Sequence, residues 1–143
     1  MRHDLTVAKS VTINASQEKV WHCLTTPDII KEYLFGTETV TDWQEGSEIV
    51  FQGEYNGQQY RDHGHILENL PGEKLIYSYW SGFSGLEDKP ENYSTITYTL
   101  AAKGDDSTEL TWAQQGFASE EGRNHSEQGM EAFLHQIKEI AER

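Results

Sequence analysis

Residues 94–115 read STITYTLAAKGDDSTELTWAQQ, a pattern that predicts two strands joined by a turn at Gly104-Asp105-Asp106. Apolar residues recur at every second position on both sides of this turn: Ile96, Tyr98, Leu100, Leu110 and Trp112. Such alternation is typical of strands with one apolar face and one face in water. We therefore expect strands near 93–102 and 107–115.

Earlier segments are separated by dipeptides that favour tight turns. Asn56-Gly57 suits the two positive-φ positions of a type I′ hairpin turn. Pro71-Gly72 suits the central pair of a type II turn. The remaining strands are expected near 6–14, 37–43, 48–54, 59–68 and 74–81. Because the connections after residue 37 are mostly short, the last six strands are expected to form an antiparallel meander.

Helical patterns bracket the strands. Ser16 is a candidate N-cap for one short helix, and Pro27 starts a second short helix that ends near Gly36. A long helix is expected to begin near Ser119, with apolar residues at i, i+3, i+4 and i+7: Met130, Phe133, Leu134, Ile137 and Ile140 or Ala141. The expected fold is α+β, a single domain over residues 1–143 in which a strongly curved antiparallel sheet wraps around the C-terminal helix.

Composition excludes several classes of partner. The chain has 143 residues, with 24 acidic and 11 basic side chains and a formal net charge of −13. Such a charge repels nucleic-acid phosphates and anionic membrane surfaces. Cys23 is the single cysteine, so no intramolecular disulfide is expected. The first residues lack a signal-peptide pattern, and no apolar stretch approaches the roughly 20 residues that span a bilayer. We therefore expect a cytoplasmic protein with no membrane partner.

Five pieces of the chain match a known family in order and spacing. They are Ala15-x4-Val20-Trp21-x2-Leu24-Thr25-x-Pro27-x-Ile29-Ile30, then Gly64-x2-Leu67-Glu68 with Pro71, Leu75 and Trp80, then Ser94-Thr95-Ile96-Thr97-Tyr98-x-Leu100, Thr108-x-Leu110-Thr111-Trp112-x3-Gly116-Phe117, and Gly129. Together they resemble the START-like (SRPBCC) superfamily, and within it the C-terminal-domain type of the heat shock protein 90 ATPase activators. The similarity spans nearly the whole chain.

The resemblance implies a helix-grip fold, in which a curved seven-stranded sheet holds a long C-terminal helix above an apolar cavity. Members of the superfamily variously bind hydrophobic small molecules, act as cyclases or hydrolases, or assist the chaperone ATPase, so the fold alone does not assign a function. The family often has Trp directly after the helix glycine. This chain has Met130 there, a smaller and more adaptable side chain that would enlarge the cavity.

The aromatic content favours a ligand-binding function. Four Trp, seven Tyr and five Phe occur in the chain. A concave sheet facing a single helix leaves space that aromatic side chains line, as in many ligand pockets. We expect the protein to bind a small, largely apolar ligand of lipid, flavonoid or polyketide type, without a cofactor. The residues expected to line this cavity are Phe51, Trp80, Tyr98, Trp112, Met130, Phe133 and Ile137.

Two other functions stay open. His63 and His65 lie two residues apart, so on a strand they share a face, where a carboxylate such as Glu54 would be needed to complete a metal site. Either histidine has the chemistry of a general base in a cyclase or hydrolase, but the sequence places no nucleophile beside it. We therefore assign no catalytic residue and no metal site. The other alternative is a protein-interaction role, in which the outer surface assists a chaperone ATPase.

Overall fold

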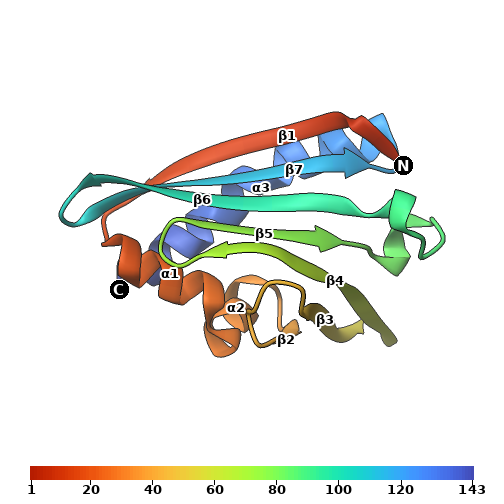
Figure 1. Cartoon of the computed structure of the whole chain (residues 1–143), viewed down its shortest axis with the longest axis horizontal. Coiled ribbons are helices and arrows are strands. Elements are labelled where there is room, and N and C mark those ends of the chain that lie inside the picture. The colour runs from red at the N-terminus through yellow and green to blue at the C-terminus, as the bar shows by residue number, and fades with distance from the viewer.

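The computed structural model describes residues 1 to 143 and contains one antiparallel sheet of seven strands. The strands are β1 (Arg2–Ile13), β2 (Glu38–Val40), β3 (Glu48–Tyr55), β4 (Gln58–Leu70), β5 (Lys74–Tyr79), β6 (Ser94–Gly104) and β7 (Ser107–Phe117). They lie in the order β1-β7-β6-β5-β4-β3-β2 across the sheet (Figure 1). The expected strands and the meander of the last six are confirmed, and β1 completes the sheet by pairing with β7.

The two dipeptide turns have the geometry that their residues favour. Asn56 and Gly57 have φ angles of 51° and 80°, as a type I′ turn requires. Gly72 has φ 81°, and the amide of Glu73 donates to the carbonyl of Leu70 at 2.9 Å, which closes the turn between β4 and β5. Both turns set the register of the hairpins that they join.

Three α-helices accompany the sheet: α1 (Gln17–Thr25), α2 (Pro27–Tyr33) and α3 (Glu120–Ala141). The Ser16 hydroxyl accepts from the Lys19 amide at 3.2 Å, and the Ser119 hydroxyl accepts from the Gly122 amide at 3.1 Å, so both expected N-caps are confirmed. α3 runs behind the sheet in Figure 1. We call the sheet face toward α3 the inner face and the opposite one the outer face. This arrangement confirms the α+β, helix-grip fold class.

Some boundaries differ from the expectation. β1 begins at Arg2 rather than near residue 6. β2 ends at Val40, although a strand to residue 43 was expected. The reason is local: Trp43 has φ 66°, outside the strand region, and the Asp42 carboxylate accepts from the Gln44 amide at 3.0 Å. This turn ends the strand.

The tightest part of the core lies around the C-terminal half of α3, which contacts α1 and β1. Residues with almost no exposed surface gather there from four elements: Ile13, Val20, Leu110, Leu134 and Ile137. In contrast, residues 120–129 of α3 include no buried side chain. The apolar packing between sheet and helix is therefore complete at one end only. No helix of the structure combines the length and the apolar character needed to cross a membrane.

Candidate functional site

A cavity of about 290 Å³ lies between the inner face of the sheet and the middle of α3. Ten of its thirteen lining residues are hydrophobic. The lining residues are Leu34, Thr37, Phe51, Tyr60, Asp62, Tyr77, Tyr79, Ile96, Tyr98, Trp112, Gln114, Met130 and Phe133. They come from the segment after α2, from strands β3 to β7 and from α3. The cavity therefore requires the complete fold, because no single element supplies more than two of them.

Five of the seven residues expected to bind a ligand lie together on this cavity: Phe51, Tyr98, Trp112, Met130 and Phe133. The other two, Trp80 and Ile137, are not among its lining residues. That the five bind a ligand stays a prediction, since the structure shows only their common position.

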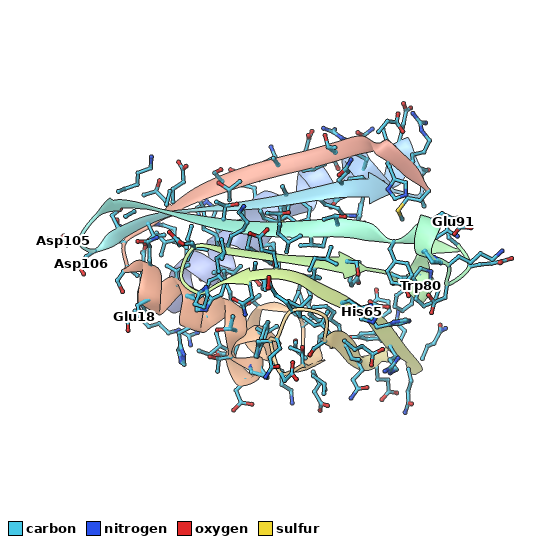
Figure 2. All side chains as sticks on the ribbon, viewed as in Figure 1. Glu18, His65, Trp80, Glu91, Asp105 and Asp106 are labelled. Atoms are coloured by element: carbon cyan, nitrogen blue, oxygen red, sulfur yellow. The ribbon has the colours of Figure 1, made fainter.

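Trp80 lies on the outer face, because neighbouring residues of a strand point to opposite sides. Tyr77 and Tyr79 of β5 line the cavity. Trp80 is the next residue after Tyr79, so its side chain points to the opposite face. Its indole Nε1–H donates to the carbonyl of Leu86 at 3.2 Å, and its ring contacts that of His63 at a centroid distance of 5.5 Å. Figure 2 shows Trp80 beside the loop that follows β5. The alternation of Leu75, Tyr77 and Tyr79 in the sequence could have identified Tyr79 instead.

Ile137 is on the correct side of α3 but at the wrong depth. Its side chain has 0% exposure and belongs to the hydrophobic core, one turn beyond Phe133. At this point the sheet and the helix are already in full contact. Helical periodicity identifies the face of a helix, but it contains no information on where along that face the contact opens into a cavity.

Asp62 is the residue of the site that sequence reasoning missed. Its side chain is only 7% exposed, and it is the one acidic or basic residue among those lining the cavity. The hydroxyl of Tyr79 donates to its Oδ2 at 2.7 Å, whereas its other oxygen, Oδ1, has no hydrogen-bond partner in the protein. Most buried carboxylate oxygens have such partners, so Asp62 is an unusual group for a cavity wall. Asp62 lies four residues before the apolar Ile66, so on a strand both side chains point to the same face. This spacing was the signal in the sequence that could have identified Asp62.

The other polar groups of the wall are already paired or neutral. The hydroxyls of Thr37 and Tyr60 lie 2.5 Å apart, and the side-chain amide of Gln114 donates to the carbonyl of Gly116 at 3.0 Å. Burial raises the pKa of Tyr77 and of Tyr98. Burial and the neighbouring Asp62 also raise the pKa of Tyr79. These phenols therefore remain protonated near neutral pH and serve as hydrogen-bonding groups rather than as charges.

The two histidines lie outside the cavity. His63 is on the outer face, where its Nε2 is 2.9 Å from Oδ2 of Asp88. His65 shares that face and is exposed (Figure 2). In the structure, no group of three or more His, Cys, Asp or Glu side chains is arranged to hold a metal ion. Both histidines are therefore separated from the apolar cavity.

Comparison with known proteins identifies the family of this chain. The family model of the activator of Hsp90 ATPase homolog 1-like proteins matches residues 14–142, which is nearly the whole chain. The protein belongs to this family. The resemblance to the heat shock protein 90 ATPase activators that the sequence segments indicated is thereby confirmed. None of the curated proteins compared with the chain matches it.

Several solved structures share the fold of this chain. A protein of Cytophaga hutchinsonii known from a solution structure is 41% identical, with a TM-score of 0.83 over 98% of this chain and 95% of that one. The Aha1 dimer of Colwellia psychrerythraea is 18% identical, with a TM-score of 0.74 over 96% of each chain. PFC0360w, an HSP90 activator from Plasmodium falciparum, is 17% identical, with a TM-score of 0.73 over 95% of each chain. The last two likenesses concern the fold alone.

Proposed function

We propose that this protein binds a small, largely apolar ligand of lipid, flavonoid or polyketide type in the cavity between the sheet and α3. The observation that carries the proposal is the lining itself, with ten hydrophobic residues among thirteen around a volume of about 290 Å³. Ligand sites are typically apolar concavities of about 300–1,000 Å³ with a few polar groups that orient the ligand. The volume lies at the lower limit of this range, which favours compact ring systems over long acyl chains.

A thermal-shift screen against lipids, flavonoid-like aromatics and polyketide-like compounds tests the proposal. A ligand present at about 100 times its dissociation constant stabilises the folded state by about 2.7 kcal/mol. For a domain of this size, that raises the melting temperature by several degrees. We expect a saturable shift with at least one class of compound.

Cavity-filling variants locate the binding. Met130→Trp and Phe133→Trp each add volume to a lining position and are expected to abolish the shift while the protein remains folded. The matched control is Leu67→Trp, because Leu67 is 51% exposed on β4 and does not line the cavity. Binding that persists in both cavity variants would overturn the proposal, as would a panel in which no compound binds to the wild-type protein.

Assistance to a chaperone ATPase is the second candidate function, and family membership is the observation that favours it. This function would use the outer surface, and the net charge of −13 of the whole chain suits a basic partner. The discriminating experiment measures the ATPase rate of an Hsp90 chaperone with wild-type protein and with Phe133→Trp. Stimulation that survives filling of the cavity supports the interaction role, and no stimulation by either protein contradicts it.

A further inference from the structure

We propose that the cavity selects ligands that carry a protonated amine, with the carboxylate of Asp62 as the group that pairs with it. This inference rests on the proposed ligand-binding function and specifies the chemistry of the ligand. Asp62 is more than nine-tenths buried, lines the cavity and leaves Oδ1 without a hydrogen-bond donor from the protein. The site thus has an acceptor that the chain itself does not satisfy.

The charge balance of the wall favours a cation over a neutral donor. No Lys, Arg or His lines the cavity to offset Asp62. The neighbouring Arg61 is on the other face of β4, where it pairs with Glu48 at 3.2 Å. A single phenol, that of Tyr79, bonds to the carboxylate. A buried charge needs both hydrogen bonds and a counter-charge, and an ammonium group supplies both, whereas an alcohol supplies only a hydrogen bond.

The aromatic surroundings favour the same ligand. Seven of the thirteen lining residues are aromatic: Phe51, Tyr60, Tyr77, Tyr79, Tyr98, Trp112 and Phe133. The ring of Phe51 lies 5.6 Å from that of Tyr77 and 5.9 Å from that of Tyr79, the residue bonded to Asp62. Aromatic faces attract cations within about 6 Å of the ring centre. A ligand with an apolar body and an ammonium group therefore matches both parts of the wall.

The Asp62 carboxylate has to turn slightly before Oδ1 can meet a ligand in the cavity. Oδ1 has almost no accessible surface, while Asp62 as a whole is 7% exposed and lines the cavity. The terminal torsion of aspartate is broad, so a partial rotation that turns Oδ1 toward the cavity has a low cost. Rotation toward the cavity allows an ammonium group to bridge the carboxylate while the Tyr79 bond is kept on the other oxygen.

Three probes with the same ring system test the proposal by isothermal titration calorimetry: 2-(2-naphthyl)ethylamine, 2-(2-naphthyl)ethanol and 2-naphthylacetic acid. We expect the amine to bind about tenfold tighter than the alcohol or better, because charge-assisted hydrogen bonds are roughly twice as strong as neutral ones. The acid is expected not to bind, since its carboxylate would face Asp62. An alcohol that binds as tightly as the amine overturns the inference, and so does an amine that does not bind.

Asp62→Asn identifies the group responsible, because it keeps the shape of the side chain and removes its charge. The amine should lose its preference over the alcohol in this variant. Glu48→Gln is the control, since it removes one carboxylate from the outer face and should leave the preference unchanged. A preference that persists in Asp62→Asn overturns the inference. Should that variant fail to fold, the comparison of the three probes on the wild-type protein still decides the matter.

The same experiment separates this inference from the proposed function. One outcome is that the alcohol binds to the wild-type protein, that Phe133→Trp abolishes this binding, and that the amine binds no more tightly than the alcohol. The cavity is then a ligand site, and only the role proposed for Asp62 is wrong. If neither the amine nor the alcohol binds, and no compound of the thermal-shift screen binds, both proposals fail.

Discussion

The hydroxyl of Tyr79 lies 2.7 Å from Oδ2 of Asp62, and this contact joins β5 to β4 on the inner face of the sheet. It holds a buried carboxylate in a mostly apolar wall and is the single side-chain hydrogen bond that the structure gives to that carboxylate. The same pair of residues therefore links two strands of the sheet and forms part of the cavity wall.

Removing the Tyr79 hydroxyl should destabilise the protein through Asp62. Hydrogen bonds to charged groups contribute about 1.5–3 kcal/mol, so Tyr79→Phe should lower the free energy of unfolding by about that amount. In an Asp62→Asn background the same substitution should cost only about 1 kcal/mol, as for neutral hydrogen bonds. Urea unfolding of the four proteins of this double-mutant cycle measures the difference. An equal cost of Tyr79→Phe in both backgrounds would show that the carboxylate charge plays no part.

Two glycines should respond in opposite ways to alanine. A Cβ at Gly64 would lie 1.7 Å from the backbone carbonyl oxygen of Ser78, so Gly64→Ala forces β4 and β5 apart and should cost about 3 kcal/mol. A Cβ at Gly129 would meet nothing within 4 Å, and the position is inside α3. Gly129→Ala should therefore stabilise the protein by about 1 kcal/mol. Denaturant midpoints of both variants check the pair, and a destabilised Gly129→Ala would contradict the assigned open space.

Alkaline pH should unfold the protein steeply, because three tyrosines in the core have raised pKa values. Burial is the first cause for Tyr33, Tyr77 and Tyr98. Their stabilising effect is complete below about pH 10, where the unfolded chain also holds these protons, and it is lost as the pH rises further. Three such groups reduce the free energy of unfolding by about 4 kcal/mol per pH unit, and Tyr79, whose pKa is also raised by burial, adds to this loss.

Absorbance at 295 nm checks this prediction, since it counts ionised tyrosines. The chain has seven tyrosines. In the folded protein, fewer than seven should ionise near their ordinary pKa, and the rest should ionise together with the loss of circular dichroism. Ionisation of all seven tyrosines near their ordinary pKa, while the protein remains folded, would contradict the prediction.

On the outer face, Asp88 should make stability depend on acid pH. Its hydrogen bond from Tyr93 and the nearby His63 lower its pKa below the ordinary value of 3.8. The contribution of a carboxylate with a lowered pKa is present above the unfolded value and disappears as the pH falls through the folded one. Asp88→Asn should thus melt at a lower temperature than wild type at pH 7. The gap should narrow below about pH 4, and a gap that is constant with pH would refute this role.

The strands and turns could be predicted from the sequence because their determinants are local. Alternation in residues 94–115 specified both the strands and the face of each that is buried. Asn56-Gly57 and Pro71-Gly72 specified the turn types through their φ preferences. Short connections then left few topologies other than a meander. Only the strand ends, such as that of β2, depended on details that periodicity does not contain.

The residues of the candidate site could be predicted from the sequence only in part. Phe51, Tyr98 and Trp112 follow from alternation, and Met130 and Phe133 follow from helical periodicity. Trp80 was selected for its aromatic side chain, without regard to the alternation of residues along β5. That alternation points Tyr79, and not Trp80, toward the cavity. Asp62 was not selected because aspartate is usually exposed, so a buried one departs from the residue preferences on which sequence reading relies.

For this protein, the sequence by itself determined the order of the elements, the turn chemistry and the face of each strand and helix that is apolar. These properties depend on residues a few positions apart, and the backbone periods of strands and helices convert them directly into structure. Tertiary structure alone decided the distance between α3 and the sheet along their length. That distance makes Ile137 part of the core and Phe133 part of a cavity wall, and it encloses Asp62 beside Tyr79. Such spacing is the outcome of packing among residues from every part of the chain, which no local pattern records.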